Sequence, residues 1–384
     1  MGAEVFEVTD GKSDRAVIKV VGVGGGGCNT VNQMVESGID GVDFVCANTD
    51  RQHLERCKTN MILQLGQGLT RGLGAGSNPD LGRQSAIEDK DRIKEIISGT
   101  DLLFITAGMG GGTGTGAAPV IAEIAKELQV LTVAVVTKPF TFEGKKRMAS
   151  AIKGIEELEK FADSMVLIPN EKLRLVMGPQ ATLVNAFKAA NDVLQNAVQG
   201  ISDLITRPGL QNVDFADVRT VMLNRGKAMM GLGTGSGDKR AELAVEMALS
   251  SPLLDDIELA NARGVLVNIC CDNSLNLDEV GLVMDRVMHI ASEDVDVKYG
   301  TSLDPALNGE MRVTVVATGL GNKAAAAAST VVTPITAAAR RSVNLDEPAI
   351  IRGGNKKAMP EALKELVMDE QLLDIPAFLR AQAD

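Results

Sequence analysis

Residues 101–116 read DLLFITAGMGGGTGTG, an apolar run that passes directly into a loop made mostly of glycine. The run at 101–107 has the length and composition of a buried strand. Glycine carries no Cβ atom, so the loop can bring backbone N–H groups close to a bound phosphate, and the N-terminus of a following helix adds a partial positive charge. We therefore predict a phosphate-binding loop at 108–116.

The same pattern occurs earlier in the chain. AVIKVVGV at 16–23 predicts a buried strand, and GVGGGGCN at 22–29 follows it and opens a helix. This loop also fits the GxGxxG pattern that dehydrogenases share, so alone it is a weak signal. A third glycine-rich loop, GQGLTRGLGAGSN at 66–78, lies between the other two. Two phosphate loops at neighbouring strand ends favour one polyphosphate that is gripped from several sides.

Strands and helices alternate along the first half of the chain. The apolar runs are rich in Val, Ile and Leu without period-2 alternation, which is typical of a parallel sheet covered on both faces. Further strands are predicted at 42–48, 131–137 and 164–169, and helices at 29–37 and 79–98. Apolar residues at helical spacing over 182–206 predict a helix of about seven turns, ended by Pro208 and Gly209. A second α/β region follows, with helices near 239–250 and 277–291 and strands at 265–270, 295–300 and 311–318.

Composition and missing motifs exclude several function classes. The formal charge of −11 argues against broad nucleic-acid binding. Only two histidines are present, which disfavours zinc enzymes and histidine triads, and no residue is predicted as a metal ligand. Five cysteines without a CxxC pair favour a reducing cytoplasm, and no apolar run reaches transmembrane length. The GKS at 11–13 has Phe6 where a P-loop needs its first glycine, so a P-loop GTPase is excluded.

Three separated motifs resemble those of one known family. GGGTGTG at 110–116 resembles the signature loop of the tubulin superfamily, and the stretch 16–319 as a whole resembles its FtsZ family. RPGLQNVDFADVR at 207–219 is similar to the synergy loop of that family, and LDIPAFLR at 373–380 to its C-terminal docking peptide. The resemblance implies a GTPase that forms head-to-tail protofilaments and assembles the cytokinetic ring at the bacterial division site.

The resemblance also implies a fold and a division into domains. We expect an α/β fold in which a parallel Rossmann-like GTP-binding domain is joined by a long central helix to a second α/β domain, with a disordered C-terminal linker and tail. The expected parts are a flexible arm at 1–15, a GTP-binding domain at 16–181, the central helix at 182–206, a GTPase-activating domain at 207–320, a disordered linker at 321–371 and a docking peptide at 372–384.

Residues that match the family motifs are expected to hold the nucleotide. They are Gly25, Gly26, Gly27, Cys28 and Asn29 in the first loop, Ala75, Gly76 and Asn78 in the loop that senses the γ-phosphate, Gly111, Gly112, Thr113, Gly114 and Thr115 in the signature loop, Glu143 and Arg147 at the ribose, and Phe187, Asn191 and Asp192 at the guanine. A carboxylate suits guanine because it accepts from both the ring N–H and the exocyclic amine. Phe187 could stack on the base, and plain core packing is the alternative. Cys28 is a departure, since many relatives have glycine or another small residue there.

Asn212, Asp214 and Asp217 are the expected catalytic residues. Taken by themselves they would be a solvated acidic turn. The resemblance implies that they reach the nucleotide of the next subunit, where Asp214 and Asp217 orient the attacking water and Asn212 contacts the nucleotide. The bound nucleotide is then GTP or GDP, with Mg²⁺ held mainly by phosphates and water and K⁺ as a further candidate ion.

The C-terminal segment is expected to bind partners. After residue 321 no sustained apolar period remains until the short cluster that holds Asp374, Ile375, Pro376, Phe378 and Leu379. A short apolar motif on a polar tether favours a docking peptide over an accidental apolar end. The resemblance implies membrane-anchoring proteins of FtsA and ZipA type and regulators of ring placement as partners, with no nucleic acid and no direct membrane insertion.

Two other functions remain open at this point. A Rossmann dehydrogenase would use one glycine-rich loop and an acid at the end of the second strand, for which Asp50 would serve. It leaves GGGTGTG, the NVDFAD stretch and the tail unexplained. A scaffold that binds nucleotide without turnover is the other alternative, against which the intact NVDFADVR stretch argues.

Overall fold

The computed structural model of the chain describes residues 16–178, 182–207, 211, 213–223, 226–254, 262–291 and 295–320. All of these belong to one compact unit. The expected arm at 1–15, Asn212, the linker at 321–371 and the docking peptide at 372–384, which carries Asp374, Ile375, Pro376, Phe378 and Leu379, lie outside the described residues.

Ten strands form one sheet. They are β1 Ile18–Val23, β2 Asp43–Asn48, β3 Met61–Gln64, β4 Leu102–Gly108, β5 Leu131–Lys138, β6 Ser164–Pro169, β7 Gly226–Gly235, β8 Gly264–Cys271, β9 Asp296–Leu303 and β10 Met311–Leu320. Their order across the sheet is β3-β2-β1-β4-β5-β6-β7-β10-β8-β9. The strands from β3 to β7 pair in parallel, while β10 runs antiparallel to both β7 and β8. The predicted α/β fold with a parallel sheet is confirmed.

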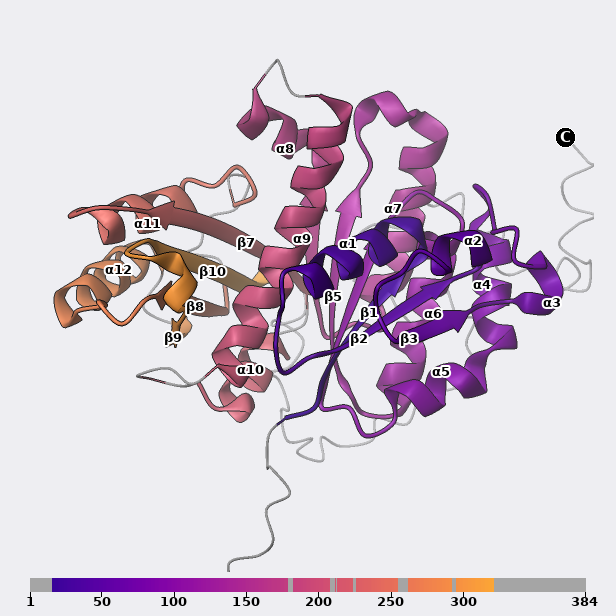
Figure 1. Ribbon diagram of the computed structural model, residues 1–384, viewed down its shortest axis with the longest axis horizontal. Helices are drawn as coiled ribbons and strands as arrows, with labels where there is room; N and C mark the ends of the chain where they lie inside the picture. Colours follow the sequence, from indigo (N-terminus) through magenta and orange to yellow (C-terminus); the bar gives the residue numbers. More distant parts are fainter. Residues whose placement is uncertain are drawn as a thin grey trace, which may run out of the picture. The chain divides into compact units, whose positions relative to one another are not determined.

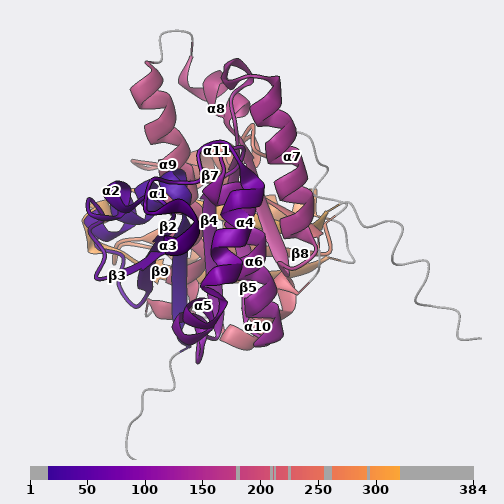
Figure 2. The ribbon, with the colours of Figure 1, turned by 90° about the vertical axis from the view of Figure 1, so that its right-hand side faces the viewer.

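Helices cover both faces of the sheet. They are α1 Gly24–Glu36, α2 Arg51–Leu54, α3 Gln67–Thr70, α4 Pro79–Glu88, α5 Lys90–Ile97, α6 Thr113–Glu127, α7 Lys145–Glu159, α8 Asn170–Met177, α9 Leu183–Thr206, α10 Phe215–Met222, α11 Arg240–Leu249 and α12 Leu277–Ile290. In Figure 1, α9 stands between the part that holds β1 to β6 and the part that holds β7 to β10. Figure 2 shows α4, α5, α6 and α7 together on the other face.

The apolar runs of the strands are continuous because each strand is buried on both faces. Val20 of β1 and Phe104 of β4 pack in one core cluster with residues of α1, α9 and α10. Their chain neighbours Val21 and Ile105 pack in a second cluster with residues of α5, α6 and α7. Most side chains along β1 and β4 are therefore apolar, with Lys19 and Thr106 as exceptions, which is why these predicted strands show no alternation.

Asp89 divides the helix predicted at 79–98 into α4 and α5. The Asp89 backbone leaves the helical region, with φ −102° and ψ 22°. Its side chain turns inward, where Oδ2 accepts from the Gly66 N–H at 2.7 Å and Oδ1 pairs with Arg92 Nη1 at 2.8 Å. The prediction of one long helix was wrong because this carboxylate satisfies the backbone of a distant loop instead of continuing the helix.

β7 was not predicted, and its glycines explain both the omission and the packing. A Cβ atom at Gly231, Gly233 or Gly235 would lie 2.0 Å or less from a backbone carbonyl oxygen of α11. The strand is therefore rich in glycine because α11 packs directly on its backbone. β7 also pairs with β6, from Ser164 opposite Gly226 to Val166 opposite Ala228, so the sheet is continuous between the two expected domains.

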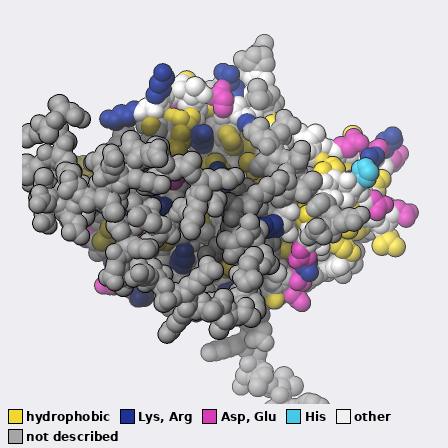
Figure 3. Space-filling model, turned by 180° about the vertical axis from the view of Figure 1, so that it is seen from behind, with side chains coloured by type: hydrophobic (Ala, Val, Ile, Leu, Met, Phe, Trp, Pro, Cys, Tyr) yellow, Lys and Arg dark blue, Asp and Glu magenta, His cyan; other side chains and the backbone are white. Residues whose placement is uncertain are grey.

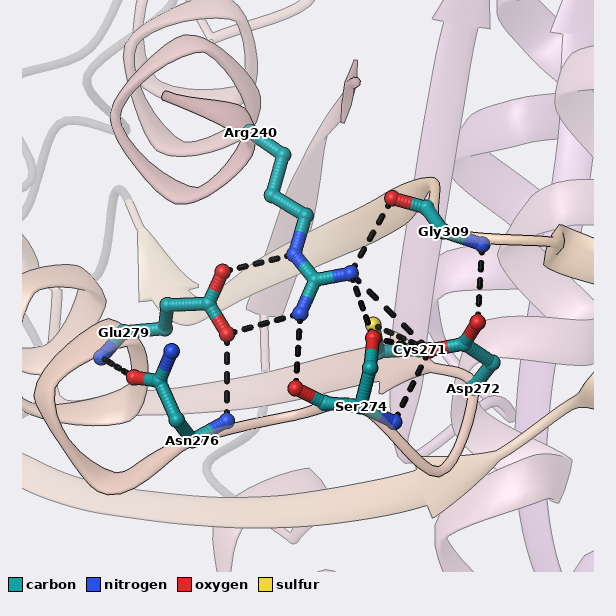
Figure 4. Close-up of polar contacts among 7 residues, drawn as sticks. All are labelled: Arg240, Cys271, Asp272, Ser274, Asn276, Glu279 and Gly309. Atoms are coloured by element: carbon teal, nitrogen blue, oxygen red, sulfur yellow. Dashed lines mark hydrogen bonds and ion pairs between the residues drawn. The ribbon is translucent and has the colours of Figure 1, made fainter. Parts of the chain in front are cut away.

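A buried ion-pair network centred on Arg240 fixes the start of α11 against the start of α12. The Arg240 guanidinium donates to both carboxylate oxygens of Glu279, at 2.6 and 2.8 Å, and to Ser274 Oγ at 2.8 Å. It also donates to the backbone carbonyls of Ser274 and Gly309, each at 3.0 Å (Figure 4). The bond to Glu279 raises the pKa of Arg240, so the pair stays ionised.

The surface formed by α11 and α12 mixes acidic and apolar side chains. Leu243, Met247, Leu277 and Met288 are all exposed there. Seen from behind, acidic groups lie beside hydrophobic ones at this end of the described part (Figure 3). Among the helices that the structure describes, none combines the length and apolar character needed to cross a bilayer.

Candidate nucleotide site

The predicted glycine-rich loops at 22–29 and 108–116 lie side by side. β1 and β4 are parallel neighbours with Val23 opposite Ala107, so the loops after them leave the sheet at the same edge. A Cβ atom at Gly26 would lie 3.3 Å from the Gly108 Cα, and one at Gly24 would lie 2.8 Å from the Gly114 nitrogen. The crevice at the carboxyl edge of a parallel sheet is the usual ligand position in this architecture.

Hydrogen bonds join the glycine-rich loop at 66–78 to the signature loop at 110–116. The Gly112 N–H donates to the Gly76 carbonyl at 2.9 Å, and the Ala75 N–H donates to Thr49 Oγ1 at 2.9 Å. Thr49 and Thr113 share a hydrogen bond of 2.6 Å between their hydroxyls. Asn78 caps α4, where its side chain accepts from the Asp80 N–H at 3.1 Å. Thr49 was not predicted; its position directly after β2, next to the phosphate loops, is the signal that could have found it.

The glycines of the site fall into two groups by what surrounds them. A Cβ atom at Gly27 would lie 2.3 Å from the Thr106 carbonyl oxygen, and one at Gly112 would lie 2.6 Å from that of Gly76. These two glycines are required by packing within the chain. Gly111 has nothing within 4 Å of its Cβ position, and Gly25 only the ring of His53 at 3.8 Å. The backbone at Gly25 and Gly111 is therefore open to an approaching phosphate.

Glu143 and Arg147 form an ion pair at the start of α7. The Glu143 carboxylate accepts from the Phe140 N–H at 2.8 Å and pairs with Arg147 Nε at 3.0 Å. Glu143 ends the short 3-10 turn Thr141–Glu143 that follows β5. Both residues line a hollow of about 650 Å³ together with Gly110 and Thr115. This hollow opens between α4, α6 and α7.

A second hollow lies between α1 and α9 and holds the residues predicted at the base. Asn29 and Asp192 line it with Gln33 and Lys188. Thr30 Oγ1 donates to Asn191 Oδ1 at 3.2 Å, and the Gln33 amide donates to Asp192 and, at 3.0 Å, to Gln195. The predicted contacts are thus divided between two hollows on either side of the loops. Gln33 was missed, although it lies one helical turn after Asn29.

Phe187 lies on the surface of α9. Its ring is 43% exposed and meets Phe140 edge to face, with 5.7 Å between the ring centroids. Phe140 in turn stacks on Phe142 at 5.0 Å. Core packing does not account for a residue this exposed, whereas an exposed aromatic side chain one helical turn before Asn191 suits a flat base.

The described catalytic candidates lie far from the glycine loops. Asp214 occupies the N-cap position of α10, and Asp217 in its first turn pairs with Lys298 Nζ of β9 at 3.2 Å. α10 follows the C-terminus of α9 (Figure 1). Asp192 lies in the N-terminal half of α9. The helix from Asp192 to Thr206 spans about 21 Å at 1.5 Å per residue. The structure therefore does not bring Asp214 and Asp217 to the same place as the loops.

Comparison with known proteins assigns two regions of the chain to known families of domains. The description "Tubulin/FtsZ family, GTPase domain" matches residues 17–178, and "FtsZ family, C-terminal domain" matches residues 226–321. The chain is 53% identical to the cell division protein FtsZ of Coxiella burnetii over 98% of its own length and 99% of that protein. It is 50% identical to the FtsZ of Pseudomonas aeruginosa over 99% of its length and the whole of that protein.

The chain belongs to the FtsZ family.

Solved structures agree with this assignment. An FtsZ dimer from M. jannaschii superimposes with a TM-score of 0.78 at 46% identity, covering 81% of this chain and 90% of that one. CetZ2 from Haloferax volcanii, at 20% identity and a TM-score of 0.67, shares the fold over 79% of this chain and 93% of its own. The predicted membership of the FtsZ family and the predicted guanine-nucleotide GTPase are confirmed, and the dehydrogenase alternative is wrong.

Proposed function

We propose that this protein is a GTP-hydrolysing cytoskeletal protein that polymerises head to tail and forms the cytokinetic ring at the bacterial division site. Its relatives at about half identity are named cell division proteins, and the M. jannaschii relative is described as a dimer. Each GTP is hydrolysed at the contact between two subunits, where the loop before α10 of one subunit reaches the nucleotide of the next.

The separation along α9 is the observation that carries this proposal. The base residues Asn191 and Asp192 lie about 21 Å of helix away from the end of α9, beyond which Asp214 and Asp217 follow. A carboxylate must lie within hydrogen-bond reach of the water that it orients. The separation therefore supports action of Asp214 and Asp217 on a nucleotide held by another subunit. A contact between two different surfaces can repeat from subunit to subunit, and it builds a filament when the repeat does not close into a ring.

Within each subunit, the open backbone of the glycine loops holds the phosphates. N–H groups at Gly25, Gly26, Gly111, Thr113 and Gly114, with the N-termini of α1 and α6, supply positive partial charge to the phosphates, while the Gly112 N–H donates to the Gly76 carbonyl. Mg²⁺ is held mainly by the phosphates and water, and K⁺ is a further candidate ion. Glu143 and Arg147 hold the ribose, while Phe187, Asn191 and Asp192 hold the guanine.

At the subunit contact, the carboxylates of Asp214 and Asp217 orient the water that attacks the γ-phosphate, and Asn212 contacts the nucleotide. The loop with Ala75, Gly76 and Asn78 senses that phosphate. Because the Gly112 N–H bonds to the Gly76 carbonyl, loss of the γ-phosphate is transmitted between the signature loop and this loop. Hydrolysis then weakens the joint between subunits.

Mixing two inactive variants tests hydrolysis between subunits. Asp217→Ala keeps the nucleotide pocket and removes the carboxylate that orients the water. Asp192→Ala damages the pocket and keeps the Asp217 carboxylate. We expect each to hydrolyse little GTP alone. In a mixture, an Asp192→Ala subunit supplies Asp217 to the intact pocket of an Asp217→Ala subunit, so phosphate release returns.

In the matched control, Asp217→Ala is mixed with a double variant that carries both Asp192→Ala and Asp217→Ala. No complete contact forms in that mixture, so it stays inactive. Pelleting shows whether the two chains copolymerise. Copolymers of the two single variants that release no phosphate would contradict hydrolysis in trans.

We also propose that the tail links the polymer to the membrane. Asp374, Ile375, Pro376, Phe378 and Leu379 would dock on adaptors of FtsA and ZipA type and on ring-placement regulators, with the chain itself staying in the cytoplasm. This rests on the similarity of LDIPAFLR at 373–380 to the docking peptide of the family.

A further inference from the structure

Three cysteine thiols from separate elements meet below the first glycine loop. Cys28 lies on α1, Cys46 on β2, and Cys57 between α2 and β3. Their Sγ atoms all lie within 4.8 Å of one another, and none of the three forms a disulfide. Cys28 and Cys46 are fully buried, while Cys57 is half-buried. Cys57 therefore opens the cluster to solvent on one side.

We infer that Cys28, Cys46 and Cys57 form a binding site for a soft divalent cation of the Zn²⁺ class. Zinc bound to thiolates has Zn–S bonds of about 2.3 Å, which places sulfurs of a tetrahedral site about 3.8 Å apart. Thiols that already lie within 4.8 Å need to approach by about 1 Å or less. That movement is within the reach of side-chain torsions, so no rearrangement of the three elements is required.

The composition of the cluster selects the metal. It contains only sulfur ligands, which favour Zn²⁺ or Cu⁺ over Mg²⁺, since Mg²⁺ prefers oxygen. Three thiolates leave one negative charge around Zn²⁺ but two around Cu⁺, and burial penalises the larger charge. In the part of the chain that the structure describes, this is the only group of three or more His, Cys, Asp or Glu side chains placed to share an ion.

Protons leave the cluster when the metal enters. One Zn²⁺ binds the sulfurs of Cys28, Cys46 and Cys57 and displaces the proton of each thiol. The three protons leave to solvent on the side that the half-buried Cys57 opens. Three Zn–S bonds form, and a fourth position remains for water.

The site would connect metal binding to the nucleotide loop. Cys28 Sγ lies 3.5 Å from the Gly22 carbonyl oxygen, and Cys46 Sγ lies 4.0 Å from the carbonyl oxygen of Cys28. A bound ion fixes the first turns of α1 to β2, and Gly25 and Gly26 are in the first turn of α1. Metal binding itself stands apart from the proposed function, whereas an effect on nucleotide affinity rests on it.

Titration of the full-length chain with Zn²⁺ tests the site. The chain is kept reduced, bound to GDP and too dilute to polymerise, and excess Mg²⁺ occupies exposed carboxylates. Competition with a chromophoric chelator measures affinity, and Co²⁺ in place of Zn²⁺ reports sulfur ligation by charge-transfer absorption. We expect one Zn²⁺ per chain and a loss of affinity of more than about tenfold in Cys57→Ser. The matched control Cys270→Ala removes a buried cysteine of β8 and should bind as the wild type does.

A measurement on the wild type alone guards against a variant that fails to fold. Zn²⁺ should slow alkylation of Cys57, followed by mass spectrometry. No stoichiometric Zn²⁺ binding, or equal affinity in wild type and Cys57→Ser, would overturn the site. A change of GDP affinity on adding Zn²⁺ to the wild type, absent in Cys57→Ser, supports the link to the nucleotide loop, and unchanged GDP affinity overturns that link alone. A chain that binds Zn²⁺ but no GDP would refute the proposed function and leave the metal site standing.

Discussion

Gly111 and Gly112 are neighbours in the chain but have opposite surroundings. A side chain at Gly111 would enter the open space that we assign to the phosphates, while one at Gly112 would meet the Gly76 carbonyl oxygen at 2.6 Å. The two glycines therefore serve different purposes, one for the ligand and one for the fold.

The substitutions Gly111→Ala and Gly112→Ala distinguish an effect on nucleotide binding from an effect on folding. We expect Gly111→Ala to change the free energy of unfolding by less than about 1 kcal/mol without nucleotide and to raise the Kd for GDP by about tenfold. Gly112→Ala should lower the free energy of unfolding by roughly 1–3 kcal/mol through overpacking. Urea unfolding and fluorescent GDP titration measure both. Equal destabilisation by the two substitutions would contradict the assignment.

Asp203 makes stability depend on pH. It lies buried in the last turn of α9, where burial raises the pKa of its carboxyl to about 6 although Arg207 Nε lies 3.0 Å away. A carboxyl whose pKa is raised in the folded chain contributes its full stability at a pH below its pKa in the unfolded chain, near 3.9. This contribution is lost as the pH rises through the pKa in the folded chain.

We expect the free energy of unfolding of the wild type to fall by roughly 2 kcal/mol relative to Asp203→Asn between pH 4 and pH 7. Urea unfolding at fixed GDP concentration across this range measures the difference. Asp278→Asn, an exposed change on α12, serves as the control and should follow the wild type. Parallel curves for wild type and Asp203→Asn would show that Asp203 does not titrate in this window.

At this scale, the sequence predicted where the glycine-rich loops lie but not what surrounds each glycine. Gly25 and Gly27 are the same residue type, so only the packing separates the open position from the crowded one. Thr49 and Gln33 form hydrogen bonds with Thr113 and Asp192, which are distant in the chain. No local pattern marks such pairs.

At the scale of elements, the Arg240 network holds α11 and α12 together. The side chains of Arg240 and Glu279 are only 9% and 15% exposed, so removing one partner strands the other charge. We expect Arg240→Ala to lower the free energy of unfolding by roughly 3 kcal/mol. Urea unfolding at fixed GDP concentration measures it.

Arg286 of α12 is the matched control. Its side chain is 53% exposed and lies 4.0 Å from Glu242 and Glu246. Exposed pairs of this kind contribute less than about 1 kcal/mol, so Arg286→Ala should be nearly neutral. Similar losses for the two substitutions would mean that burial does not set the strength of the Arg240 network.

Elements were predictable where burial alone dictates the sequence. β4 and β5 are covered on both faces, so their apolar runs were readable. β7 was not, because close contact with α11 replaces apolar side chains by glycine. The break between α4 and α5 was missed for a related reason, because the Asp89 carboxylate accepts a hydrogen bond from the N–H of Gly66, 23 positions away in the chain.

At the scale of the whole molecule, the filament contact and the tail should be separable. All elements to which we assign nucleotide binding, together with the described acidic residues, lie within 16–320, outside the segment 373–384. We expect deletion of 373–384 to leave both GTP turnover and the threshold concentration for light scattering unchanged within about twofold, while binding to FtsA-type adaptors is lost. A raised threshold would show that the tail contributes to the filament.

In the filament that we propose, the separation along α9 of the nucleotide pocket from Asp214 and Asp217 would make the two tips chemically unequal. At one tip the last nucleotide would face solvent with no acidic loop against it, and at the other an acidic loop would face solvent with no nucleotide to act on. The GTP at the first tip would then stay intact until another subunit arrives, and each arrival would start hydrolysis in the subunit before it. Distance from that tip would measure the age of a subunit, and the oldest, weakest joints would lie at the far end.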